Sequence, residues 1–191
     1  MHLDDALLEV VSFLGEQQIP YMVIGGFAVL FWGRSRVTRD LDLTVSCPPD
    51  ELPVMVEHLR RRFRVLPPDP LEFAQQHRVI PMQVGEVRVD LVLAGLPYEE
   101  KAIRRARTVV VGGRPIKVCS PEDLIIHKVI SDRPQDREDV REIVKRQGRT
   151  LDRQYMDPIV AELSRALDRP DIVRFYEQCF CEIGCHNSTS L

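Results

Sequence analysis

Two aspartates separated by one residue, Asp40 and Asp42, lie in the segment DLDLTV, which otherwise has the apolar pattern of a buried strand. Side chains alternate faces along a strand, so the two carboxylates share a face, about 7 Å apart along the backbone, while Leu41 and Leu43 point into a core. Two like charges on one face repel each other. A divalent cation offsets that repulsion, and Mg²⁺ is commonly held by one or two carboxylates plus substrate phosphates.

A third carboxylate, Asp90, lies inside the apolar segment VRVDLVL, where a charge is unexpected. If that segment is the strand beside the one that carries Asp40, three carboxylates converge, which is enough to hold two divalent ions. Such a pair of ions stabilises the attacking and leaving oxygens of an in-line phosphoryl displacement. The alternative is that each aspartate ends or edges its strand and is solvated.

A pair of glycines, Gly25 and Gly26, lies between a predicted strand at residues 21–24 and a short apolar helix at residues 27–32. A turn of this kind exposes backbone N–H groups at a helix N-terminus, which suits a phosphate. No Lys-Ser/Thr pair follows, as a P-loop would require, and the G-x-G-x-x-G pattern of dinucleotide sites is absent. The alternative is a plain tight turn.

The elements that position these residues follow from hydrophobic periodicity and turn signals. In the first two thirds we expect helices at residues 4–17, 27–32 and from 50 to the arginines at 60–62, and strands at 21–24, 40–46, 79–84, 87–93, 109–111 and 115–118. In the last third we expect helices at residues 121–131, 137–146, 154–167 and 171–181. Ser120 is the expected N-cap of the first of these, with Pro121 at its first position.

This order predicts an α+β fold: a small mixed β-sheet with flanking helices in residues 1–120, then a helical region in residues 121–191 packed on that core. The proline-rich stretch at residues 67–70 is expected to form a rigid surface connection.

The formal net charge of -3 gives no global attraction to nucleic acid or to anionic membranes. A nucleic-acid partner would need a local basic patch, and two candidates are the arginines at 60–64 and the basic residues at 101–107. No apolar run is long enough to span a membrane, and the N-terminus MHLDDALLEVV carries acids where a secretory signal carries bases. We therefore expect a cytoplasmic protein without a membrane partner.

Five cysteines, an odd number, favour reduced thiols over a disulfide framework. Three of the cysteines and a histidine lie near the C-terminus: Cys179, Cys181, Cys185 and His186. These residues lack the paired C-x-x-C spacing of small zinc sites, which favours incidental cysteines at a frayed terminus.

Two motifs carry a family resemblance. The stretch GGFAVLFWGRSRVTRDLDL resembles the signature of the DNA polymerase β-like nucleotidyltransferase superfamily, a Gly-Gly or Gly-Ser turn followed by D-x-D. It is more narrowly similar to small bacterial nucleotidyltransferases related to the AbiEii-type toxins. The stretch SPEDLIIHKVISDRPQDREDV is similar to their second signature, a Ser/Thr-Pro-Glu-Asp helix with a lysine and an Arg-Asp-rich segment. The two segments anchor residues 21–143.

The resemblance implies a nucleotidyltransferase fold with two Mg²⁺ ions and an NTP as substrate. Asp40 and Asp42 match the metal-binding pair, and Asp90 matches the third carboxylate, which binds the catalytic metal and helps to deprotonate the attacking hydroxyl. The residues implied for nucleotide binding are Gly25, Gly26, Thr38, Arg39 and Lys128.

Some of these roles have an alternative. Lys128 is either the lysine that reaches the phosphates or a solvated helix lysine. Asp136, Arg137 and Asp139 belong to the second signature, and the sequence does not separate catalysis from helix capping and ion pairing there.

We therefore expect a Mg²⁺-dependent enzyme that transfers a nucleoside monophosphate from an NTP to a hydroxyl acceptor: an RNA such as tRNA, a protein or a small molecule. The toxin-like resemblance implies a toxin–antitoxin role with a cognate antitoxin. Two alternatives are a catalytically weak antitoxin or partner protein with this fold, and an antibiotic nucleotidylyltransferase.

Overall fold

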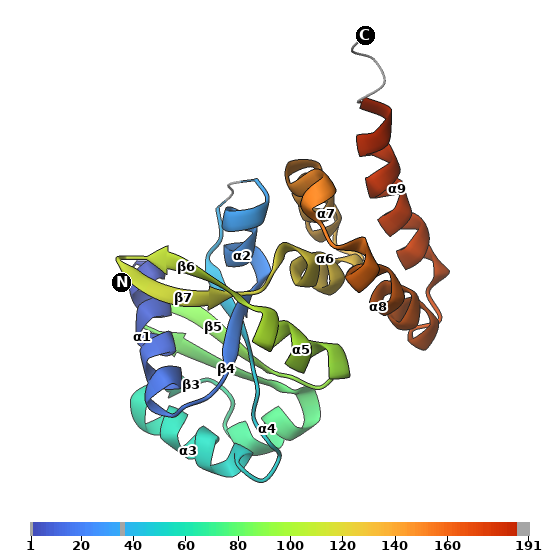
Figure 1. Ribbon diagram of the computed structural model, residues 1–191. Coiled ribbons are helices and arrows are strands. Elements are labelled where there is room, and N and C mark those ends of the chain that lie inside the picture. Colours follow the sequence, from blue (N-terminus) through green and yellow to red (C-terminus); the bar gives the residue numbers. More distant parts are fainter. Residues whose placement is uncertain (1, 35–36, 187–191) are drawn as a thin grey trace. The chain divides into compact units, whose positions relative to one another are not determined.

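A computed structural model of the protein describes residues 2–34 and 37–186. The chain forms two compact units (Figure 1): the first comprises Met1–Ala28 and Val37–Cys119, and the second comprises Val29–Arg36 and Ser120–Leu191. The second unit thus includes a short segment that a boundary at residue 120 would leave with the core. Packing of the helical region on the core stays a prediction.

The first unit is built on one mixed seven-stranded sheet with the order β3-β4-β5-β2-β1-β7-β6. β2 runs antiparallel to β1 and parallel to β5, so the strand that carries Asp90 lies beside the strand that carries Asp40, as the sequence hypothesis required. The strands are β1 (Tyr21–Ile24), β2 (Asp40–Val45), β3 (Arg64–Val65), β4 (Val79–Val84), β5 (Val87–Leu93), β6 (Arg107–Val111) and β7 (Arg114–Val118).

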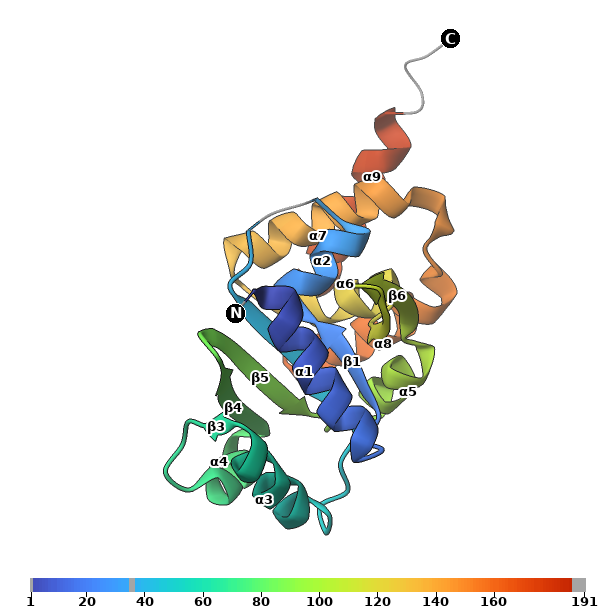
Figure 2. The same cartoon turned by 90° about the vertical axis from the view of Figure 1, so that its left-hand side faces the viewer.

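Helices cover both faces of this sheet. Figures 1 and 2 show α1 and α5 on opposite faces. The rings of Phe13 and Phe63 meet edge to face at 5.4 Å, which joins α1 to the end of α3 on one face. On the other face Ser46 donates to Glu100 of α5 at 2.8 Å. The helices with residues in this unit are α1 (Leu3–Glu16), α2 (Gly25–Trp32), α3 (Leu52–Arg62), α4 (Pro70–His77) and α5 (Pro97–Arg105).

Two of these helices, α4 and α5, were not predicted from the sequence, and each begins with a proline. Pro70 and Pro97 occupy the first helical turn, where a missing N–H costs nothing. Asp69 caps α4 by accepting a hydrogen bond from the backbone N–H of Glu72 at 3.0 Å. The stretch at residues 67–70 therefore leads into a helix and is not simply a connection.

The second unit is helical throughout its C-terminal part, as the sequence predicted. Trp32 and Gly33, at the end of α2, are tied to α7 because their carbonyl oxygens accept hydrogen bonds from Gln147 and Arg146. The helices are α6 (Pro121–Val129), α7 (Pro134–Gln147), α8 (Arg153–Ala166) and α9 (Pro170–His186), with a 3₁₀ turn, η1 (Gly148–Thr150).

The last helix, α9, extends beyond its predicted end at residue 181. Cys179 is buried in the packing of this helix, and Cys181 is exposed; both are free thiols. The side chains of Cys185 and His186 lie outside the described residues, so the predicted absence of a zinc site there stays a prediction. None of the described helices has the length and hydrophobicity needed to cross a membrane.

The predicted N-cap of α6 is confirmed. The hydroxyl oxygen of Ser120 accepts from the backbone N–H of Asp123 at 3.1 Å, and the same hydroxyl donates to the Asp123 carboxylate at 2.6 Å. Tyr155 of α8 donates to the other oxygen of that carboxylate at 2.6 Å, so the cap belongs to a buried polar network that joins two helices.

Replacing Ser120 with Ala should lower the free energy of unfolding by about 1–2 kcal/mol, because a cap and a buried hydrogen bond are lost together. Urea denaturation measures this. Ser12→Ala is the control, since the Ser12 hydroxyl donates only to the Leu8 carbonyl of its own helix and should be nearly neutral. Equal effects of the two substitutions would contradict the role given to the cap.

Candidate active site

The D-x-D pair lies at the start of β2. Asp40 is exposed and Asp42 is partly buried, whereas Leu41 and Leu43 are fully buried. The alternation expected of a strand is therefore present, and it places both carboxylates on one face with the leucines in the core.

Asp90 lies directly beside Asp42. The two residues are register partners in the parallel pair formed by β2 and β5, so their Cα atoms are about 4.8 Å apart. Leu43 and Leu91, the next pair in register, are both fully buried, and the two aspartates therefore share the opposite face. The structure thus brings the third carboxylate to the first two.

The glycine turn also meets the D-x-D pair. Gly25 follows Ile24, the register partner of Asp42 in β1, and has a φ of +65°. A Cβ atom added to Gly25 would lie 2.1 Å from an oxygen of the Asp42 carboxylate. The carboxylate thus lies against backbone that only glycine leaves open. Helix α2 begins at Gly25 itself, two residues earlier than predicted, so this backbone is the helix N-terminus.

Arg88 is a residue of this site that the sequence analysis missed. It precedes Asp90 by two residues on β5 and is the register partner of Asp40. Its Nε donates to both oxygens of the Asp90 carboxylate, at 3.1 and 3.3 Å. The alternation in VRVDLVL was the available signal, because residues two apart on a strand share a face.

The donor set suits Mg²⁺, since carboxylate oxygens are the ligands it prefers. In the residues that the structure describes, however, no group of three or more His, Cys, Asp or Glu side chains is arranged to hold a metal ion. The Asp90 oxygens face Arg88 instead. A complete metal site therefore requires Asp90 to exchange its ion pair for the metal.

Thr38 and Arg39 lead into β2. The hydroxyl of Thr38 donates to the backbone carbonyl of Asp40 at 3.3 Å, which supports the start of the strand, and Arg39 is exposed. The contact of these two residues with a nucleotide stays a prediction.

Lys128, in the second unit, is not a solvated helix lysine. Its Nζ lies 2.5 Å from Asp136 and 2.8 Å from Asp139, and only 6% of its side chain is exposed. The two aspartates are buried to a similar degree. In this structure the second signature therefore forms a buried ion-pair cluster between α6 and α7. A phosphate-binding role for Lys128 stays a prediction.

Asp136 is the most heavily bonded member of this cluster. Burial alone would raise its pKa, but hydrogen bonds from Lys128, Ser131 and Arg133 outweigh burial and hold the pKa below its usual value. Arg137 is half-buried against α9, where it lies 3.4 Å from Asp171 and over the ring of Phe175. Ion pairs, a hydrogen bond from Ser131 and a cation–π contact thus account for these contacts.

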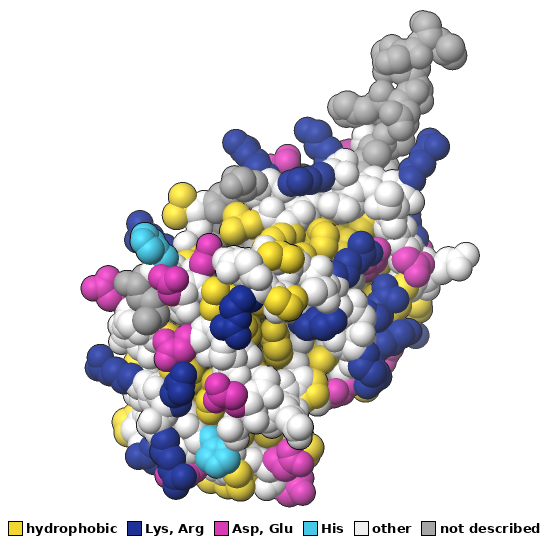
Figure 3. Space-filling model, turned by 60° about the vertical axis from the view of Figure 1, so that its left-hand side comes forward, with side chains coloured by type: hydrophobic (Ala, Val, Ile, Leu, Met, Phe, Trp, Pro, Cys, Tyr) yellow, Lys and Arg dark blue, Asp and Glu magenta, His cyan; other side chains and the backbone are white. Residues whose placement is uncertain are grey.

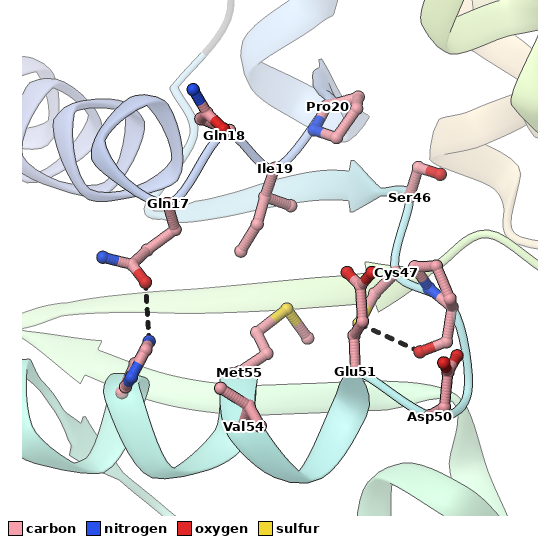
Figure 4. A pocket seen from close by; sticks show the side chains of 12 residues that line it. Gln17, Gln18, Ile19, Pro20, Ser46, Cys47, Asp50, Glu51, Val54 and Met55 are labelled. Atoms are coloured by element: carbon pink, nitrogen blue, oxygen red, sulfur yellow. Dashed lines mark hydrogen bonds between the residues drawn. The ribbon is translucent and has the colours of Figure 1, made fainter.

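A cavity of about 460 Å³ lies at the other end of β1 and β2 (Figure 4). Ile19 and Met55 point into it, and a 2.6 Å hydrogen bond between Gln17 and His58 closes one side. Cys47 lines it as well, and burial, with nearby Glu51 and Asp50, raises the pKa of this thiol. None of the three aspartates of the candidate site lines this cavity.

Solved structures of other proteins have a similar fold. The antibiotic-resistance factor ANT(2'')-Ia matches with a TM-score of 0.58 and 16% identity, over 86% of this chain and 92% of that one. The lincosamide antibiotic adenylyltransferase LnuA matches at 0.52 and 13%, over 73% and 94%. A nucleotidyltransferase-like protein from Paracoccidioides brasiliensis matches at 0.51 and 16%, over 90% and 89%. At these identities the similarity shows the fold alone.

The sequence profile of one family, described as "nucleotidyl transferase of unknown function (DUF2204)", matches residues 71–181, more than half of the chain. No curated protein matches the sequence. The matched span contains Asp90 and Lys128, whereas Gly25 and Asp42 precede it. The part of the site formed by the glycine turn and the D-x-D pair therefore rests on motif and geometry.

Replacing Gly25 with Ala should destabilise the protein more than a glycine substitution that adds strain alone. The positive φ costs about 1–2 kcal/mol for any L side chain, and the collision with Asp42 adds about 1–3 kcal/mol. Gly113→Ala is the matched control, because Gly113 has a φ of +79° and nothing within 4 Å of an added Cβ. Urea denaturation compares the two variants, and equal losses would contradict the close approach of Asp42.

Replacing Lys128 with Met should lower the free energy of unfolding by about 3–5 kcal/mol at pH 7, because two buried carboxylates lose their cation. The lowered pKa of Asp136 contributes stability that is present above the unfolded-state pKa and is lost as pH falls through the folded one. The difference between wild type and variant should therefore shrink as pH falls below about 4.

Urea denaturation from pH 7 to pH 3 tests this, with Lys145→Met as the control because Lys145 is exposed near the end of α7. A pH-independent difference would show that the cluster is held by packing and not by charge.

Proposed function

The chain belongs to the nucleotidyl transferase family described as of unknown function, and on that premise we propose that it transfers a nucleoside monophosphate from an NTP to a hydroxyl acceptor, with Mg²⁺. The observation that carries this proposal is the meeting of three elements: the Asp42 carboxylate lies against Gly25 and beside Asp90. A turn suited to polyphosphate and carboxylates suited to a metal thus share one end of the sheet.

In the proposed reaction the acceptor oxygen forms a bond to the α-phosphorus, the bond to the bridging oxygen breaks, and pyrophosphate leaves. Bound Mg²⁺ supplies the neutralisation of charge on the reacting phosphates. Asp40 and Asp42 on β2 and Asp90 on β5 would hold the metal, and the N–H groups at the start of α2 would bind the triphosphate. Asp90 is the proposed base, which takes the proton of the acceptor hydroxyl at a carboxylate oxygen.

Two observations bear on the chemical class of the acceptor, and they favour a small molecule and RNA respectively. Two of the proteins with a similar fold are described with antibiotics, one with adenylyl-2''-tobramycin and the other with lincomycin, which supports a small hydroxylated molecule. A basic segment supports RNA as the second candidate: residues 101–119 contain six Lys or Arg and no acid, in a chain of net charge -3.

The two basic stretches noted in the sequence differ in their surroundings. On α3, Arg61 pairs with Glu57 at 3.1 Å and Arg62 with Glu9 at 3.6 Å, which fits an ordinary solvated helix face. The stretch at residues 101–107 instead belongs to the longer basic segment at residues 101–119 in α5, β6 and β7, where Arg104, Arg107 and Lys117 are exposed. Acidic and basic side chains are mixed on the face drawn in Figure 3. An RNA acceptor would therefore be held by the α5–β6–β7 segment.

The narrower AbiEii-type assignment, a toxin–antitoxin role with a cognate antitoxin, and cytoplasmic location all remain predictions. The alternative of a catalytically weak partner protein makes a different prediction, since such a protein should show no thermal shift with Mg²⁺ plus each NTP. The enzyme should be stabilised by its substrate.

Replacing Asp42 with Asn should lower nucleotidyl transfer at least 100-fold, because one metal-binding oxygen loses its charge. Purified protein is incubated with α-³²P-labelled NTPs, Mg²⁺ and either tRNA, a protein mixture or tobramycin, and labelled product is counted. Asp50→Asn is the control, since Asp50 is exposed beside the cavity at the other end of β2. Transfer that survives Asp42→Asn in a folded variant would overturn the proposed function.

A further inference from the structure

The guanidinium of Arg88 lies beside Asp90, where its positive charge opposes the binding of a metal ion. Arg88 lies on the same face of β5 as Asp90, and in register with Asp40 on β2. Arg88 is therefore two residues from Asp90 along β5 and directly opposite Asp40 across the sheet.

The contact between Arg88 and Asp90 uses the atoms that a metal would need. Nε lies 3.1 Å from one oxygen of Asp90 and 3.3 Å from the other. A carboxylate that faces a guanidinium in this way cannot direct the same lone pairs at a divalent cation, and the two cations repel each other. This agrees with the finding that, over the chain that the structure describes, no three acidic, histidine or cysteine side chains form a metal-holding group.

The exposure of the pair indicates that it can open. The side chain of Arg88 is 54% exposed and that of Asp90 is 23% exposed. Ion pairs exposed to this extent are weak and exchange with solvent. The buried cluster of Lys128, by contrast, is only 6% exposed at the lysine. The ion pair between Arg88 and Asp90 is thus suited to reversible opening.

We propose that Arg88 is a positioning residue that holds Asp90 in the metal-free protein and is displaced by the metal. The inference rests on the metal site of the proposed function and adds a regulation to it. Arg88 offsets the repulsion among three carboxylates when no metal is bound, and in return it lowers the affinity of the site for the metal. Metal occupancy and release of Asp90 from Arg88 are then one coupled equilibrium.

The test measures metal binding directly. Mn²⁺ serves as the probe, and free Mn²⁺ is followed by electron paramagnetic resonance during titration of the full chain. Arg88→Gln should bind Mn²⁺ about fivefold more tightly than wild type, because the competing cation is gone. Arg64→Gln is the matched control. Arg64 is an exposed arginine of the same sheet, and it contacts Gln83, which is the register partner of Arg88. This variant therefore removes the same charge at a greater distance from the site. Its affinity should stay within about twofold of wild type.

A double-mutant cycle shows whether the effect passes through Asp90. In an Asp90→Asn background, Arg88→Gln should change Mn²⁺ affinity no more than Arg64→Gln does in the same background. Circular dichroism confirms that each variant is folded. A purely structural role for Arg88 would leave Mn²⁺ affinity unchanged.

The outcomes separate this inference from the proposed function. If Asp42→Asn abolishes Mn²⁺ binding but Arg88→Gln leaves Mn²⁺ affinity unchanged, the inference alone is overturned. Weaker binding by Arg88→Gln, or an equal gain in the Asp90→Asn background, also overturns it. Absence of Mn²⁺ binding in wild type and in Arg88→Gln alike overturns both the inference and the metal site on which it rests.

Discussion

The close approach of the Asp42 carboxylate to the backbone of Gly25 is the constraint on which the candidate site depends. A Cβ at Gly25 would lie 2.1 Å from the carboxylate oxygen, so no other residue type fits there without movement. The order of strands brings the other residues of the site together. β2 lies between β1, which leads into the glycine turn, and β5, which carries Asp90. Three sequence motifs spread over more than 60 residues thereby become neighbours at one end of the sheet, within the first unit.

Each unit contains a basic side chain set among carboxylates, and burial gives the two clusters different properties. Lys128 contacts Asp136 and Asp139 out of reach of solvent, where breaking one partner leaves an uncompensated charge, so the cluster fixes α6 against α7. Arg88 contacts Asp90 at the surface, where water competes for both groups. The same pairing of charges thus stabilises structure in one unit and remains exchangeable in the other.

Much of the first unit could be predicted from local pattern. The alternation in DLDLTV gave the shared face of Asp40 and Asp42, because side-chain direction in a strand depends only on neighbouring residues. The register of Asp42 with Asp90 was a hypothesis, since pairing between distant strands is set by the whole sheet. The contact of Arg88 with Asp90 was missed although both residues lie on one face of the same strand, where the alternation in VRVDLVL was the available signal. Helices α4 and α5 were missed, and each begins with a proline, a residue that is favoured in the first helical turn but breaks a helix elsewhere. Lys128 was expected to reach solvent or phosphate, and its burial depends on the packing of α6 on α7, which the sequence does not show.

Helix α2 belongs to both units, since its first residues lie in the first and its last in the second. The carbonyl groups that end it, at Trp32 and Gly33, are bound by side chains of α7, more than 110 residues later in the chain. A fragment cut at residue 119 would therefore keep every strand and every candidate carboxylate, yet it would lose the partners of the helix whose first residue lies against Asp42. A cut at residue 119 thus separates the end of α2 from the α7 side chains that bind its carbonyl groups, although both belong to the second unit.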